Sequence, residues 1–416
     1  MKKLSLVLVL VMLISCFAVG CGGGSDTDTE SDTSAATGTA VEGTTIYVGV
    51  FEPTTGENGG GGMQEVLGAR YANQLYPTVD IDGTTYDIEL VEVDNQSDKA
   101  AAVTAAQSLI SKGVVAVLGS YGSGVSIAAG ETFANAAVPA VGCSCTNPQV
   151  TLGNDFYFRA CFLDPFQGTV MANYAVDEGY TKAAVISQNG DDYSTGLAQY
   201  FKAAFEELGG EIVSDVTYNT NESDFNALLT SIKGTNPDCI FVPSSIATAT
   251  LIIPQIKANG IDAQILASDT WENAAIISDA AVGVTFSTFF DETDESNSVA
   301  VEFVKGFKDY INSDPQNLTW NSNTDTVAAV SALGYDSYMA VYEALKALDG
   351  KGLETITSVD IRDALVDVSF DGVTGAIAFD ENGDAIKDTA YIKTVTEESL
   401  TTLEFQFVRT QSVADL

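Results

Sequence analysis

Two polar loops carry the side chains whose types and spacing could bind a ligand. Gly119–Ser126 and Cys143–Pro148 each follow a short apolar run, and they contain no lysine or arginine. They offer backbone N–H groups and hydroxyls, so a small anion bound here would be held by neutral donors. The alternative is that both loops are only tight connectors. The residues with hydroxyl groups are Ser120, Ser123, Ser126, Ser144 and Thr146.

The chain of 416 residues contains no histidine. This excludes Ser–His and Cys–His nucleophiles, histidine metal ligands and the usual general base near neutral pH. No CxxC motif is present either, so we expect no metal site and no cofactor. An exported enzyme that uses carboxylates or lysine remains an alternative, but no nucleophile arrangement is recognisable. The composition therefore favours a binding protein over an enzyme.

A strand–helix–strand unit must position the two polar loops. Val114–Leu118 and Val138–Gly142 are short apolar runs typical of buried parallel strands, and Ile127–Ala136 between them has helical spacing. Both strands end at the same edge of a sheet, and ligands of open α/β sheets bind at that edge. The loops should therefore lie side by side.

The same alternation of strands and helices runs through the rest of the chain. It begins with the strand Ile46–Phe51 and restarts after Asp164-Pro165, which predicts two α/β domains with parallel sheets. If the two sheets face each other, further polar loops would line the same cleft. These loops are Gln188–Ser194, Pro243–Ala247 and Ser268–Asn273.

The glycine-rich stretch Glu52–Gly62 is predicted to be a loop that needs close backbone approach. A phosphate-binding role is the alternative, but no GK[ST] follows and no basic residue lies in the stretch. The whole chain carries a formal charge of −39. Nucleic acid is therefore not an expected partner, because phosphate binding needs clustered positive charge.

The N-terminal segment reads as a targeting sequence. Residues 1–20 combine Lys2 and Lys3 with an apolar core too short to span a bilayer comfortably. FAVGC then ends at Cys21, the expected lipidation site of a lipoprotein; Cys16 is the second candidate, and a plain secretory signal is the alternative. Residues 21–44 are expected to be a flexible polar tether.

Other charged and sulfur-containing residues receive structural predictions. Arg70 and Arg159 are expected to form structural ion pairs. Asp191 and Asp192 are expected to be solvated, with a calcium loop as the alternative. An exported chain could pair cysteines, so the body holds either buried free thiols or one disulfide. The cysteines concerned are Cys143, Cys145, Cys161 and Cys239.

Several motifs, in this order and spacing, resemble the type I solute-binding proteins of ABC importers, the branched-chain amino acid-binding class. The resemblance covers the body from Thr45 to about Thr410. The motifs are LGARYA (67–72), GSYGSGVSIA (119–128), CTNPQVT (145–151), FRACFLDPFQG (158–168), QNGDDYSTGLA (188–198), SDFNALLTSIK (223–233) and QIKANG (255–260).

This resemblance implies a fold of two Rossmann-like α/β lobes with parallel sheets, joined by three crossovers. The N-terminal lobe would comprise residues 45–162 and 291–371, and the C-terminal lobe residues 163–290 and 372–416. The ligand would be buried between the lobes, and the protein is expected to be a monomer.

The resemblance also implies ligand-binding residues. Ser123 and Thr146 match positions that bind the ligand carboxylate, and Cys145 matches one that contacts the ligand amine through its carbonyl. Tyr193 and Asp269 match the second-lobe tyrosine and the acid that pairs with the α-ammonium. Tyr121, Ser144, Ser245 and Trp271 complete the expected site.

Two departures from the family pattern leave the side-chain specificity open. The family usually has glutamate at Asp269, and its second-lobe aromatic residues are replaced here by Ser244–Ala247, so Tyr121 and Trp271 are expected to refill the pocket. The disulfide of some relatives is missing, because Ser97 and Gly122 occupy those positions.

The function that the resemblance implies is extracytoplasmic capture of an amino acid, branched-chain by preference, by a lipid-anchored protein that delivers it to a membrane permease powered by ATPase subunits. One alternative keeps the fold and changes the ligand to a short amide, a urea-like compound or an aromatic acid. Another is an extracellular sensor that acts on a signalling partner.

Overall fold

The computed structural model describes residues 38–412, which contain two main β-sheets. The first sheet has the order β2-β3-β1-β4-β5-β6, and only β2 runs antiparallel to its neighbour. Its strands are β1 (Thr45–Glu52), β2 (Thr78–Ile81), β3 (Thr84–Asp94), β4 (Ala116–Leu118), β5 (Ala140–Gly142) and β6 (Tyr157–Arg159).

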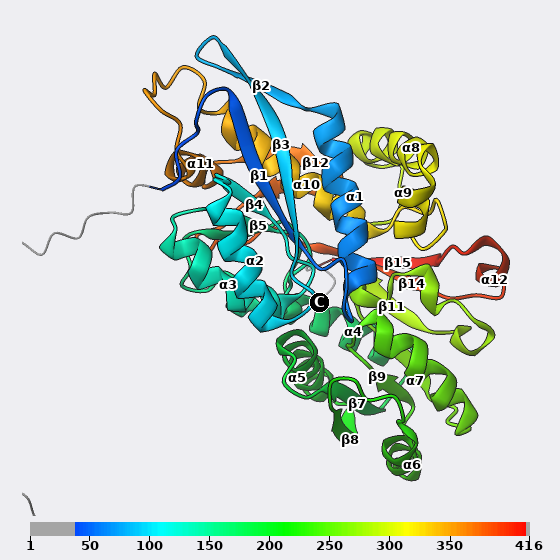
Figure 1. Cartoon of the computed structure of the whole chain (residues 1–416). Coiled ribbons are helices and arrows are strands. Elements are labelled where there is room, and N and C mark those ends of the chain that lie inside the picture. Colours follow the sequence, from blue (N-terminus) through cyan, green and yellow to red (C-terminus); the bar gives the residue numbers. More distant parts are fainter. Residues whose placement is uncertain (1–37, 413–416) are drawn as a thin grey trace, which may run out of the picture. The chain divides into compact units, whose positions relative to one another are not determined.

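Helices cover both faces of the first sheet (Figure 1). Alternate residues of β1 point to opposite faces. Val48 and Val50 belong to the core shared with α1 (Gly59–Leu75) and α10 (Ala329–Lys346), whereas Phe51 packs with α2 (Lys99–Ser111) and α3 (Ser123–Asn135). Burial on both faces explains the apolar runs of β1, β4 and β5, whereas β2 and β3, at one edge of the sheet, carry many polar residues.

The second sheet has the order β15-β14-β11-β10-β9-β7-β8. The strands from β8 to β11 run parallel, and β14 and β15 form an antiparallel edge. They are β7 (Lys182–Gln188), β8 (Glu211–Tyr218), β9 (Cys239–Phe241), β10 (Gln264–Ala267), β11 (Thr285–Thr288), β14 (Thr389–Thr394) and β15 (Gln406–Ser412).

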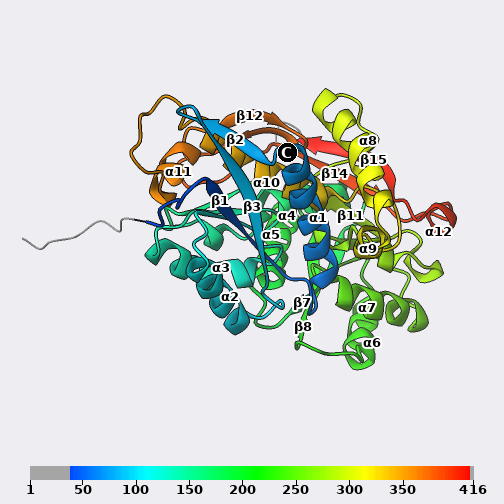
Figure 2. The ribbon, with the colours of Figure 1, turned by 45° about the horizontal axis from the view of Figure 1, so that its top comes forward.

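Helices also cover the second sheet. Helices α4 (Asp164–Asp177) and α5 (Asp192–Glu207) pack against each other on one side. Helices α6 (Asn226–Thr235) and α7 (Ile246–Ala258) lie together on the other side (Figure 2), over a core that includes Trp271.

The chain passes between the two sheets three times. It leaves the first sheet after β6 and returns after β11, where α8 (Ser298–Ser313), α9 (Pro315–Trp320) and α10 pack on α1. After α11 (Ser358–Leu365) and the hairpin of β12 (Ser369–Gly372) and β13 (Gly375–Ala378), it enters β14, and α12 (Ser399–Thr402) precedes β15. This confirms the predicted fold class. The lobe boundaries remain a prediction, and the one between residues 371 and 372 falls within β12.

Arg159 joins two of these passages. Its backbone N–H donates to Gly383 O (2.9 Å), and its carbonyl accepts from the N–H of Ala385 (3.0 Å). The fully buried guanidinium forms an ion pair with Asp384 and donates to Cys145 O (2.8 Å). The structural ion pair predicted for Arg159 is therefore confirmed. Arg70 likewise pairs with Glu92.

Two expectations about loops are wrong. The glycines Gly59–Gly62 form the first turn of α1 instead of a loop, although close approach does explain them: a Cβ on Gly61 would lie 2.1 Å from the Tyr121 ring. Ser123 and Ser126 lie in the first turn of α3, and Ser126 Oγ donates to Gly122 O (2.9 Å). The polar loop is therefore shorter than expected, and α3 starts at the site.

The predicted leader, including Cys16 and Cys21, lies outside the described residues. Between residues 38 and 412, no helix is long and apolar enough to cross a bilayer. The four body cysteines are buried free thiols, which was one of the two expected states.

Candidate functional site

A small cavity of about 20 Å³ lies between loops of the two sheets. That volume holds about one water molecule, so the loops are closed on each other. The first-sheet side contributes Glu57, Asn58, Tyr121, Gly122 and Ser123. The second-sheet side contributes Gln188, Asp191, Tyr193, Ser245 and Thr270. Two larger hollows, of about 440 and 450 Å³, lie elsewhere, beside α11 and beside β13.

Two hydroxyls on the first-sheet side are available to an anion. Ser123 opens α3, and its Oγ accepts from the N–H of Asn147 (3.2 Å), which leaves the hydroxyl proton free to donate. Thr146 is fully buried without lining the cavity, and its Oγ1 makes no hydrogen bond of regular geometry in the described part of the chain, although it lies close enough to the Asp164 carboxyl to lower the pKa of that group. Because buried polar atoms are normally paired, an unpaired hydroxyl beside a cleft indicates a place for a ligand atom.

The second-sheet side supplies a buried carboxylate. The Tyr193 hydroxyl lies 2.7 Å from Asp269 Oδ1, and Gln167 Nε2 donates to the same oxygen (2.7 Å). Asp269 is 2% exposed, and no lysine or arginine among residues 38–412 forms an ion pair with it. Burial raises the pKa of Asp269 to about 6, although the bonds from Tyr193 and Gln167 oppose that rise. Near neutral pH the site therefore presents a negative charge without a cation.

A second carboxyl lies beside Thr146 and is neutral. Asp164 begins α4 and is fully buried, and burial raises its pKa to about 8, while the neighbouring Thr146 hydroxyl lowers it. The nearby Asp269 charge also favours the protonated form of Asp164. The surroundings of Thr146 can therefore accept an anion near pH 7, because the adjacent acid carries no charge.

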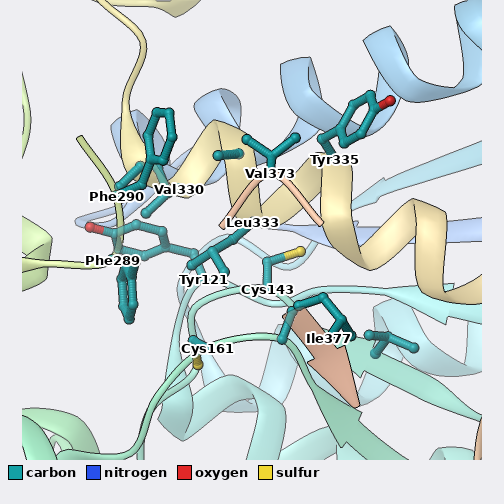
Figure 3. Close-up of a cluster of buried hydrophobic side chains, with 14 of the residues drawn as sticks. Tyr121, Cys143, Cys161, Phe289, Phe290, Val330, Leu333, Tyr335, Val373 and Ile377 are labelled. Carbon is teal, nitrogen blue, oxygen red and sulfur yellow. The ribbon is translucent and has the colours of Figure 1, made fainter. Parts of the chain in front are cut away.

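Tyr121 and Ser245, both expected in the site, line the cavity. The Tyr121 ring packs among buried apolar side chains that include Cys143 and Phe289 (Figure 3), and its hydroxyl donates to Thr270 O on the other side (3.4 Å). Ser245 caps α7 by accepting from the N–H of Thr248 (3.2 Å).

The other expected residues, Thr146 and Asp269 among them, do not line the cavity. Trp271 is fully buried in the core of the second sheet, where its Nε1 donates to Ser244 O (3.0 Å). The Cys145 carbonyl accepts from Arg159, and the Ser144 hydroxyl donates to Glu65. In this closed arrangement, Trp271, Cys145 and Ser144 therefore bind other protein groups and stabilise the loops of the site.

Below the first-sheet loops lies a pair of buried carboxyls, Glu52 at the end of β1 and Glu65 on α1. Glu52 Oε2 accepts from the N–H of Tyr121 (2.7 Å), and Glu65 Oε1 accepts from Ser144, so each carboxyl holds one loop. Burial raises the pKa of Glu52 to about 8 and that of Glu65 well above its usual range, where the charge of Glu52 adds to the effect. Two adjacent buried carboxyls of this kind retain a proton between them near neutral pH.

Cys143 lies with this pair, and the three possible ligand atoms are within 4.8 Å of one another. The spacing would suit a metal ion. However, burial and the two carboxyls raise the pKa of the Cys143 thiol well above its usual value, so it is not the thiolate that binds metals. The cluster therefore acts as a protonated support for the two loops.

The sequence analysis missed Glu57 as a lining residue, and it placed the loop Gln188–Ser194 at the cleft without naming Gln188 or Asp191 as site residues. The expectation that Asp191 is solvated is wrong: it is half-buried, caps α5 by accepting from the N–H of Ser194 (2.7 Å) and faces the cavity. Its neighbour Asp192 pairs with Lys99 across the loops (2.7 Å). The signal was available in part, because Gln188–Ser194 follows a predicted strand.

Known proteins resemble the chain over most of its length. A family model described as periplasmic binding protein matches residues 45–399. The Leu/Ile/Val-binding protein homolog 1 of Brucella abortus (strain 2308) is 29% identical over 350 residues, which are 82% of this chain and 87% of that protein. A leucine-binding protein from Thermotoga maritima is 31% identical, with a TM-score of 0.79, over 89% of this chain and 100% of that one.

A second solved structure shows the same architecture. It is the substrate-binding protein of a branched-chain amino acid transporter from Streptococcus pneumoniae, in complex with isoleucine. It is 30% identical, with a TM-score of 0.75, and the match covers 89% of this chain and 99% of that one. The long family match and the two mainly parallel sheets agree: the chain belongs to the periplasmic binding protein family, with the type I fold.

Proposed function

We propose that this protein captures an amino acid between its two sheets and delivers it to the membrane permease of an ABC importer. The observation that carries the proposal is the presence of opposite groups on the two sides of one small cavity, which Ser123 and Tyr193 line; Thr146 and Asp269 do not line it, but Asp269 is hydrogen-bonded to Tyr193. Ser123 and Thr146 offer hydroxyls to a carboxylate, and Asp269 offers a buried negative charge to an ammonium group. A zwitterion satisfies both sides at once.

Members of this family are solute-binding proteins of ABC transporters that work outside the cytoplasm, and they are not enzymes. The relatives from Thermotoga maritima and Streptococcus pneumoniae are a leucine-binding and an isoleucine-bound protein, which supports an amino acid as the ligand class. In the proposal Cys21 carries the lipid anchor, residues 21–44 are the tether, and the ligand-loaded protein acts as a monomer.

Ligand binding would be coupled to closure of the two sides. Gln64 accepts from Asn273 Nδ2 (3.2 Å) and Tyr121 donates to Thr270, so the two sheets contact each other directly in the closed arrangement. An amino acid cannot enter a cavity of about 20 Å³, and the sides must therefore separate first. The bound ligand then shifts the equilibrium toward the closed form, which the permease recognises.

Titration calorimetry with single amino acids tests the proposal. We expect saturable binding of at least one amino acid, and we expect Asp269→Asn to weaken it by about 3–5 kcal/mol, since a buried ammonium loses its partner. That loss is roughly 150- to 5000-fold in Kd. Asp262→Asn, at an exposed position on the same side, is the matched control. Binding of benzoate or another non-zwitterionic acid, with no amino acid bound, would refute the assignment of Asp269.

A further inference from the structure

The walls of the cavity are polar. Its ten lining residues include two tyrosines and a glycine but no leucine, isoleucine, valine, methionine or phenylalanine. Sites for aliphatic side chains are lined mainly by apolar groups that replace water around the ligand. A branched-chain side chain would be poorly matched to this polar wall. The lining therefore points to a ligand whose side chain is itself polar.

Two carboxyl groups face the cavity from opposite sides. Glu57 precedes α1 on the first-sheet side, and Asp191 precedes α5 on the second-sheet side. Gln188 Nε2 donates to both oxygens of Glu57 (3.2 and 3.3 Å), and Tyr218 donates to Gln188 Oε1 (3.1 Å), which fixes the direction of that amide. Burial raises the pKa of Glu57, and the charge of Asp191 adds to the rise.

The nearby cation, Lys99, forms no ion pair with Glu57 or Asp191, although its charge opposes the rise that burial causes in the pKa of Asp191. Lys99 Nζ binds Asp192 Oδ2 (2.7 Å) and Gly190 O (3.2 Å), its side chain is 49% exposed, and it does not line the cavity. Glu57 and Asp191 therefore line a space that no lysine or arginine among residues 38–412 lines, and a third carboxyl group, Asp269, is hydrogen-bonded to the lining residue Tyr193. The α-ammonium of a ligand would balance only one of them.

We infer that the ligand is an amino acid with a cationic side chain, and that Glu57 and Asp191 bind its second positive charge. This inference rests on the proposed function, since it places the α-carboxylate at Ser123 and Thr146 and the α-ammonium at Asp269. Tyr193 lines the cavity and bonds to Asp269, so it connects the two ends of the site. Glu57 and Asp191 close on the side-chain cation from opposite sheets, which couples its capture to closure.

Calorimetry on the purified protein with matched ligand pairs tests the inference. Arginine is compared with citrulline and lysine with norleucine, because each pair differs chiefly in charge; leucine, isoleucine and valine are measured alongside. The expected result is that arginine or lysine binds at least about tenfold more tightly than its neutral partner. Tighter binding of leucine, isoleucine or valine than of every cationic amino acid would overturn the inference and leave the proposed function intact. If no amino acid binds, both fail.

Two conservative variants test whether Glu57 and Asp191 recognise the charge of the ligand or only hold the two sides of the cavity together. Glu57→Gln keeps the shape beside Gln188, and Asp191→Asn keeps an oxygen to cap α5. Each should weaken binding of the cationic ligand by at least about tenfold, or about 1.4 kcal/mol, and change that of its neutral partner less than about twofold. Equal losses for both ligands would overturn the inference, because the two acids would then only hold the sides together. Glu222→Gln, at an exposed position, is the matched control.

Discussion

The affinity for a zwitterionic ligand should depend on pH in a way set by two buried carboxyls with opposite requirements. Asp269, with a pKa of about 6, must be ionised to bind the ammonium. Asp164, with a pKa of about 8, must be protonated so that it does not repel the carboxylate beside Thr146. Affinity should therefore rise with pH through about 6, reach its maximum near pH 7 and fall again through about 8.

The size of each change in affinity follows from the fraction of protein that can bind, in which Asp269 is ionised and Asp164 is protonated. One pH unit beyond either pKa, about nine-tenths of the protein carries the wrong charge, so affinity at about pH 5 or 9 should be about tenfold below the maximum, or about 1.4 kcal/mol. Titration calorimetry between these limits, with one amino acid in buffers of equal ionic strength, measures the profile.

Asp164→Asn separates this cause from titration of the ligand itself. Asparagine mimics the protonated acid, and the ligand's own ammonium titrates identically with both proteins. The variant should lose the fall above about pH 8 that is due to Asp164 and keep the fall below about pH 6. An alkaline fall of the same size in both proteins, or a flat profile between pH 5 and 9, would refute the reasoning.

Two further predictions concern stability. The raised pKa of Glu52 means that the folded chain holds a proton which the unfolded chain releases above about pH 4.5, so the free energy of unfolding should fall as pH rises from about 5 to 8. Urea unfolding at about pH 5 and 8 measures this fall in the free energy of unfolding, which should be smaller in Glu52→Gln than in the unmodified protein. An equal fall in both proteins would contradict the proton shared by Glu52 and Glu65. Arg159→Met should lower the free energy of unfolding by about 3–5 kcal/mol in urea, because Asp384 and the Cys145 carbonyl lose their buried donor. A loss under about 1 kcal/mol would contradict that role.

Much of the fold was predictable because the central strands of both sheets are buried on both faces. The apolar runs Ile46–Phe51 and Val138–Gly142 indicate parallel strands whatever their surroundings, and β1 and β5 lie there. The start of α1 was not predictable, because four glycines have low helix propensity. Packing requires glycine at two of the four positions: a Cβ on Gly61 would lie 2.1 Å from the Tyr121 ring, and one on Gly62 would lie 2.0 Å from Pro53 O.

The site was predictable where its residues follow strands. Ser123, Tyr193 and Ser245 come after apolar strands, and the structure brings them to one cavity. Trp271 was harder, because a tryptophan in a polar loop can turn either way, and here the carbonyl of Ser244 holds its indole in the core. Glu57 could not be found from its own surroundings, since its role depends on Gln188 across the cleft, far away in sequence.

The Arg159 contacts have a mechanical consequence. The residue ends β6 just before the first passage between the sheets, and it binds the turn at Gly383–Ala385 that leads into the third passage. A guanidinium buried among backbone carbonyls cannot slide without leaving its charge unpaired. In the proposed opening, we therefore expect Arg159 to act as a hinge point: contacts such as Tyr121 with Thr270 would break, and those around Arg159 would keep their lengths.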